Sequence, residues 1–152
     1  GGAASIEFTG IPQDGVDLVI ALSLRTNGVP YVSNIVLDIN DYATSASKKT
    51  LYGTGSSVSS SSTANAPWTS GAGSTASTFG STNFYLSNYS GSTAKSISAD
   101  GVFENNATAA FQAIVAGLWN STSAITGLRF TMENGTAWVQ HSTASIYKIT
   151  AD

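Results

Sequence analysis

A run of large apolar residues at every second position most constrains what this chain can fold into. Within Val16–Leu24, positions 16, 18, 20, 22 and 24 are all large and apolar, and the residues between them include aspartate, alanine and serine. A pleated strand places alternate side chains on one face, whereas a helix would distribute these five around its axis. The segment is therefore predicted to be a strand with one buried face.

The same alternation recurs in segments 5–9 and 34–39, and turn-forming glycine, asparagine and serine clusters separate nearly all such segments. Many short strands between turns favour an all-β sandwich or barrel. A length of 152 residues fits a single domain spanning 1–152. Further strands are expected over 49–52, 83–87, 94–103, 109–119, 127–133 and 144–150.

Two segments leave alternatives open. The alanines of 107–119, with Thr108 as a cap, suit a helix, but placing Phe111 and Trp119 on one face favours a strand. Residues 53–80 are almost entirely serine, threonine, glycine and alanine, as in a flexible linker. A structureless loop of that length is uncommon inside a compact domain, so an excursion with one or two weak strands, held by Trp68, is expected instead.

Composition excludes several classes of function. Charged residues make up only 10% of the chain, the net charge is −3, and the six lysines and arginines form no cluster that could neutralise phosphates. We therefore expect no nucleic-acid partner. No apolar run approaches the roughly 20 residues that cross a bilayer, so no membrane insertion is expected. There is no cysteine, which removes disulfides and thiolate chemistry.

The residues that could carry catalysis are few. His141 is the one histidine, and no serine stands in the Gly-x-Ser-x-Gly turn that a hydrolase would pair with it. Asp100 and Glu104 lie four apart on an expected strand and share its face, but no aromatic sugar cleft surrounds them. We expect no enzyme activity and no cofactor.

One acidic cluster could hold calcium. Asp38, Asn40 and Asp41 offer hard oxygen ligands, but Ala43 and Lys49 stand where an EF-hand loop has its glycine and its bidentate glutamate. Capping of the turn after a strand is the preferred interpretation, and no metal site is expected.

The aromatic residues divide into two groups. Phe111 and Trp119 follow the apolar pattern and are expected in the core. The others lie in or beside turns, where they could stack on a glycan, form a subunit interface or pack internally. The candidate contact residues are Trp68, Trp138, Tyr31, Tyr42, Tyr85 and Tyr89.

Several phrases stand in order along essentially the whole chain: SIEFTGIP at 5–12 with DLV at 17–19, LYGTGSS at 51–57, ENNAT at 104–108, AGLWNSTSAI at 116–125 and STASIYKI at 142–149. Together they resemble small bacteriophage virion structural proteins of the tail-fibre, head-fibre or capsid-decoration type. The family often ends on a Tyr-Gly-Ile step, and here Lys148 replaces the glycine, so that side chain is expected to face solvent or a partner.

The resemblance implies an antiparallel, jelly-roll-like β-sandwich without catalytic or cofactor residues. It implies a virion surface protein, outside the cell in the particle, that contacts other virion proteins of the capsid or tail and forms a homo-oligomer, with a trimer as one form. An alternative on the same scaffold is a glycan-binding module that attaches a tail fibre to its host.

Overall fold

The structure is a computed structural model that describes residues 2–40, 42–43, 47–62, 67–106 and 109–151, except for the side chains of residues 42 and 43. Within these residues the regular structure is entirely β, and no helix there is long and apolar enough to cross a membrane. The strands are β1 (Ile6–Thr9), β2 (Asp17–Leu24), β3 (Val32–Ile39), β4 (Tyr42–Ala43), β5 (Ser47–Gly53), β6 (Val58–Ser61), β7 (Trp68–Ser70), β8 (Gly80–Leu86), β9 (Lys95–Glu104), β10 (Ala110–Trp119), β11 (Gly127–Met132) and β12 (Thr143–Ile149).

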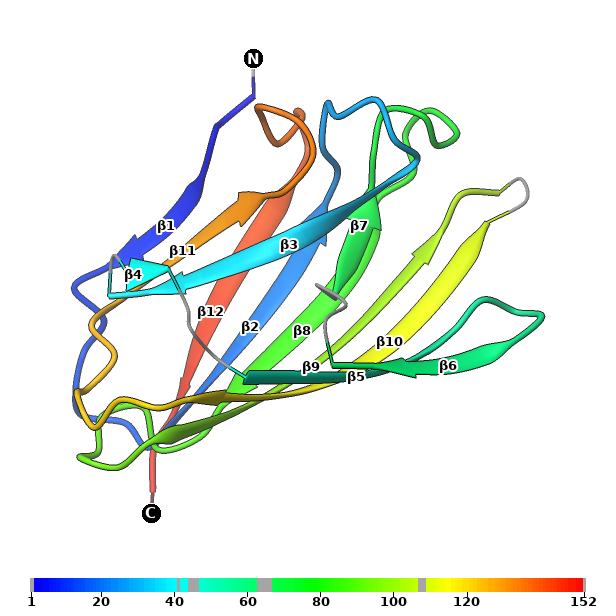
Figure 1. The fold of residues 1–152 in the computed structure, drawn as a ribbon. Helices are drawn as coiled ribbons and strands as arrows, with labels where there is room; N and C mark the ends of the chain where they lie inside the picture. The colour runs from blue at the N-terminus through cyan, green and yellow to red at the C-terminus, as the bar shows by residue number, and fades with distance from the viewer. Residues whose placement is uncertain (1, 41, 44–46, 63–66, 107–108, 152) are drawn as a thin grey trace.

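The strands form two antiparallel sheets that pack against each other. A five-stranded sheet has the order β1-β11-β3-β4, with β7 pairing to β3, and a seven-stranded sheet has the order β12-β2-β8-β9-β10-β5-β6. Figure 1 views the five-stranded sheet in front of the larger one. The chain passes between the sheets at most of its connections. The expected antiparallel β-sandwich is confirmed.

Alternation along the strands produces the core, as the sequence predicts. In β2 the inward residues from Leu18 to Leu24 are buried at every second position, and Ile35, Leu37 and Ile39 of β3 face them from the other sheet. Three rings connect the layers: Phe130 of β11 lies 6.4 Å from Phe8 and 5.5 Å from Phe84, centroid to centroid. Val16, just before β2, is the one member of the original alternation that stays exposed.

The segment with competing helix and strand interpretations is a strand. Ala110–Trp119 pairs with β9 on one side and β5 on the other, with Trp119 buried and Phe111 half-buried on the inward face. Thr108, the proposed helix cap, lies outside the described residues. The Ser/Thr-rich stretch contains the short strands β6 and β7, as expected for a weakly structured excursion.

One corner of the sandwich is closed by backbone contacts between the sheets. Arg25, directly after β2, forms a parallel bridge with Ser70 at the end of β7, and the Thr26 N–H donates to the Ser70 carbonyl at 2.9 Å. A Cβ on Gly80 would lie 2.9 Å from the Thr69 Cα, so glycine is needed where β8 passes β7. The residues from 71 to 79 are thereby held against the end of the sandwich.

Replacing Phe130 with alanine tests the ring contact between the sheets. Phe130 is fully buried, so Phe130→Ala should lower the free energy of unfolding by about 3–5 kcal/mol through lost burial and an unfilled cavity. Urea denaturation measures the change. Val29→Ala is the control, because Val29 is 85% exposed in a loop. Equal effects of the two variants would contradict the described core.

Candidate functional site

Two of the predicted contact aromatics are core residues. Trp138 is 2% exposed and donates its indole N–H to the Phe130 carbonyl at 3.1 Å, and Tyr89 is fully buried with its hydroxyl donating to the Pro12 carbonyl. Both lie near turns in the sequence, but contacts with distant segments bury them. Of the three alternatives left open for these aromatics, internal packing is the one that Trp138 and Tyr89 follow.

The remaining candidates lie at three separate places. Tyr31 is exposed in the turn before β3, and Tyr85 is exposed on β8 in the outward face of the larger sheet. Trp68 is half-buried on β7. Tyr42 lies on β4, and its side chain is outside the described part of the structure. The structure does not gather these four residues into one site.

Tyr31 and Trp68 belong to a group of rings that we call the aromatic cluster: Tyr31, Tyr52, Trp68, Phe103 and Phe111. Tyr31 is stacked with Phe103 and with Phe111, with 6.4 Å between centroids in each pair, and Trp68 meets Phe111 at 5.5 Å and Tyr52 at 5.2 Å. The cluster lies between β7, the end of β9, the start of β10 and the end of β5. Tyr31 is 44% exposed and provides its accessible edge.

The second candidate surface is the outward side of the seven-stranded sheet, which we call the outer face. Its side chains are those that alternate with the core residues, and about half of them are serine, threonine, alanine or asparagine. Large apolar side chains also stand on it, and Ile114 is 57% exposed. Its apolar members with substantial exposure are Leu51, Val58, Tyr85, Val102, Ile114, Leu118, Tyr147 and Ile149.

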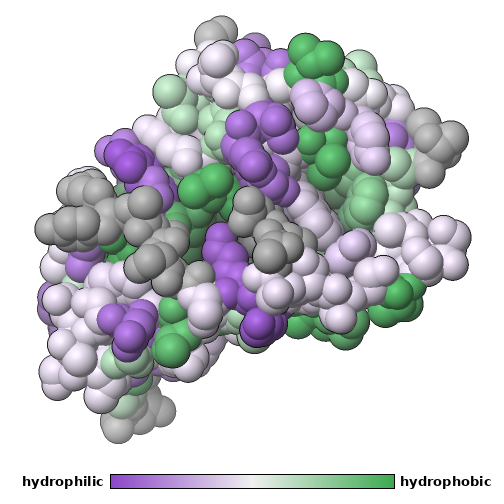
Figure 2. Space-filling model, viewed as in Figure 1, coloured by the Kyte–Doolittle hydropathy of each residue, from purple (hydrophilic) through white to green (hydrophobic). Residues whose placement is uncertain are grey.

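The five-stranded sheet has a different outward side. Glu7, Arg129 and Asp38 follow one another across β1, β11 and β3, and Arg129 Nη2 lies 2.9 Å from Asp38 Oδ2. Figure 2, viewed from this side, shows hydrophilic side chains among pale and some hydrophobic ones. An ion pair on a sheet face is usual for a side that stays in water, so the larger sheet is the better candidate for contact.

Two electrostatic contacts lie near the start of β2, one on the outer face and one beside it. The Tyr85 hydroxyl donates to Asp17, and this hydrogen bond raises the pKa of Tyr85. Lys148 is exposed, as expected, and its Nζ lies 2.6 Å from Asp14 Oδ1, which lowers the pKa of Asp14. Both contacts are satisfied within the chain, so neither provides a free charge for a ligand.

The possible catalytic residues stand apart from one another. His141 is exposed in a turn with a φ of 73°, and no hydroxyl donor to it is recorded among the described residues. Asp100 and Glu104 do share a face of β9, but their Cα atoms lie about 13 Å apart along an extended strand. The Glu104 carboxylate accepts the Asn106 N–H at 2.7 Å, as a turn cap does.

The possible calcium ligands have structural partners instead. Asp38 pairs with Arg129, while Asn40 has a φ of 51° and accepts the Thr126 N–H at 2.8 Å. Asn40 therefore joins the end of β3 to the residues just before β11. The turn after β3, where a cap is predicted, includes residues outside the described part of the structure. Asp41 lies outside the described residues. Within the part of the chain that is described, no three acidic, histidine or cysteine side chains are grouped as metal ligands would be.

The buried arginine shapes the loop beside the aromatic cluster. The Arg25 guanidinium donates to the carbonyls of Thr75 and Thr78, both at 2.9 Å, and of Ser74 at 3.0 Å. Burial lowers the pKa of Arg25. Because these acceptors all belong to residues 71–79, one side chain fixes a loop whose own side chains, apart from Phe79, are too small to form a core.

Lys95 is a second buried cation, at the opposite end of the sheet. Its side chain is fully buried, its Nζ donates to the carbonyls of Gly91 at 2.7 Å and Ser123 at 2.6 Å, and it lies 5.6 Å from the centre of the Trp119 ring. Burial lowers the pKa of Lys95. Its hydrogen bonds join the turn before β9 to the loop after β10, which is a structural role.

Sequence reasoning missed the apolar residues of the outer face. A signal was present in Ala110–Trp119, where Ile114, Ala116 and Leu118 alternate with the inward residues, so that the strand is apolar on both sides. A strand with one side in water normally carries polar residues there. Apolar residues on both sides indicate that the second side is also a contact surface.

Comparisons with protein-family models, curated proteins and solved structures found no match for this chain. The resemblance to bacteriophage virion proteins therefore stays a prediction. The two surfaces described above are the structural observations on which a function can be proposed.

Replacing Arg25 with methionine tests its role in the loop. Arg25→Met keeps the apolar stem but removes the donors, so it should lower the free energy of unfolding by about 2 kcal/mol. It should also speed amide hydrogen exchange in residues 71–79. Lys148→Met is the control and should leave the urea midpoint nearly unchanged, because an exposed ion pair contributes little. Unchanged exchange in Arg25→Met would contradict this role.

Proposed function

We propose that this chain is a non-enzymatic structural protein of the bacteriophage virion surface, a capsid-decoration or fibre component. It acts through contacts with other copies and with neighbouring virion proteins. The observation that carries the structural part of this proposal is the outer face, which is broad, weakly charged and partly apolar. The resemblance in sequence supports the assignment to a virion.

The physical basis is the low cost of removing such a surface from water. Serine, threonine and alanine lose little side-chain freedom on contact, and few charges on the outer face need to be desolvated. Isolated leucine, isoleucine and valine side chains add burial energy. A protein that must be held in place on a particle benefits from these properties more than one that diffuses freely.

Labelling of intact particles tests the proposal. Gold-conjugated antibodies raised against the purified chain should bind phage particles from the source culture at repeated positions on the capsid or tail. Preimmune antibodies are the control. Recovery of the chain only in the soluble fraction, with no label on particles, would contradict a virion role.

The aromatic cluster favours a second function, a glycan-binding attachment module. Tyr31 is 44% exposed beside the hydroxyl-rich loop 71–79, where the Ser74 hydroxyl donates to the Tyr31 carbonyl, and sugar binding commonly combines an aromatic ring with such hydrogen-bonding groups. Trp68 supports this cluster through Tyr52 and Phe111. Trp68→Ala would therefore damage the cluster as well as any binding.

A glycan array with surface variants separates this function from a purely structural one. If the cluster binds sugar, Tyr31→Ser should lose the signal of the wild type while circular dichroism shows that the β fold is kept. Tyr147→Ser is the matched control, because Tyr147 is an exposed tyrosine on β12, away from the cluster. A silent array with folded wild-type protein, or equal loss in both variants, would remove this second function.

A further inference from the structure

The outer face has a pattern of charge that fits a second copy of itself. On β10, Ile114 pairs with Asp100 of β9 on one side and with Leu51 of β5 on the other. Lys49 lies two residues before Leu51, opposite Ala116. The pleat places all five on the outward side, and Asp100 and Lys49 are exposed there. A negative and a positive side chain thus flank the apolar centre of β10.

We propose that two copies of this chain pair through their outer faces, about a two-fold axis that lies in the interface, crosses β10 between Ile114 and Ala116 and runs perpendicular to the line from Asp100 to Lys49. This pairing rests on the proposed function, since it names one of the subunit contacts through which the protein acts. In a face-to-face pair of this kind, each residue of one copy lies opposite the residue that occupies the reflected position, on the other side of the axis, in the second copy. Asp100 of each copy then faces Lys49 of the other.

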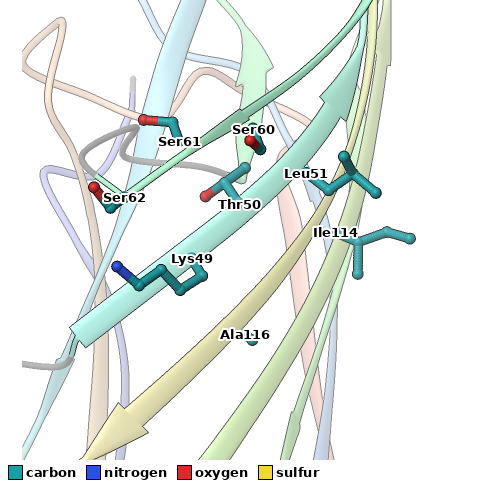
Figure 3. Close-up of a pocket in the computed structure, with 8 residues that line it drawn as sticks. All are labelled: Lys49, Thr50, Leu51, Ser60, Ser61, Ser62, Ile114 and Ala116. Atoms are coloured by element: carbon teal, nitrogen blue, oxygen red, sulfur yellow. The ribbon is translucent and has the colours of Figure 1, made fainter.

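The same operation also matches the apolar residues. Ile114 of one copy then comes beside Leu51 of the other, where the surface is hollowed between β10, β5 and β6. Figure 3 shows Leu51 and Ile114 side by side, projecting in the same direction from their strands. The hollow is lined by Lys49, Thr50, Leu51, Ser60, Ser61, Ser62, Ile114 and Ala116.

The size of the overlap is sufficient for a reversible dimer. An axis over β10 covers the five strands from β8 to β6, whose average length is about eight residues. With about 4.8 Å between strands and about 3.4 Å per residue, each copy contributes about 600 Å². The total of about 1,200 Å² is at the lower limit of specific protein interfaces, so micromolar affinity is expected.

Charge considerations favour this position of the axis over the centre of the sheet. The middle strand of the seven is β9, and an axis over its centre would bring Asp100 of each copy against Asp100 of the other. Like charges facing each other across an interface weaken it. Moving the axis one strand along, to β10, exchanges that repulsion for two opposite-charge contacts.

Sedimentation equilibrium of the purified chain, at concentrations up to about 100 µM, tests the pairing. The wild type should dimerise, and Lys49→Glu or Asp100→Lys alone should each weaken the dimer about tenfold or more, because each creates two like-charge contacts. The double variant Lys49→Glu/Asp100→Lys should recover wild-type affinity. Ile114→Asp should abolish the dimer. Circular dichroism confirms that every variant keeps its β fold.

The matched control is Glu133→Lys, which makes the same charge change as Asp100→Lys at an exposed position after β11. It should leave dimerisation unchanged. A monomeric wild type at about 100 µM, or a dimer that the double variant fails to restore, would overturn the pairing. Particle labelling distinguishes this failure from failure of the proposed function. If the chain is monomeric in solution but antibodies against it label the virion, only the pairing is excluded.

Discussion

The packing of two alternating sheet faces around Ile20, Phe84 and Phe130 determines every surface of this protein. Because side chains on a strand point alternately to opposite sides, each residue held in the core fixes its neighbours on the outside. A shift of one residue in the pairing of β2 or β8 would move the apolar set into water and the serines into the core. The core therefore holds the outer face in one arrangement, and the chain has no cysteine that could do so by disulfides.

Alternation explains why the strands could be predicted and why the surroundings of several aromatic residues could not. Within Val16–Leu24 the pattern is local, so the strand and its buried face follow from neighbouring residues alone. Trp138 has no such pattern: bridges to Ala3 and Thr26 bury it, and these residues are more than 100 positions away in sequence. Tyr89 is likewise buried through a distant partner, Pro12. Long-range pairing of this kind leaves no periodic trace near the residue it buries.

The candidate surfaces could be predicted only in part. Tyr31 and Tyr85 are exposed, as surface contacts require, but the sequence did not show that Tyr31 belongs to a stack with Phe103 and Phe111. The outer face depends on the order of strands in the larger sheet, which places β5 beside β10 although the two are some 60 residues apart in sequence. Without that order, Leu51 and Ile114 are isolated apolar residues, and the charges beside them have no spatial relation.

The loop held by Arg25 has a consequence for the conditions under which the protein keeps its shape. Guanidinium groups stay protonated far above neutral pH, and peptide carbonyls do not titrate. Neither Arg25 nor the loop carbonyls that accept its hydrogen bonds therefore change charge in mild acid. A loop held by carboxylates instead would lose these interactions as the carboxylates gain protons. Residues 71–79, and the edge of the aromatic rings beside them, should therefore hold the same geometry in acidic and in neutral surroundings.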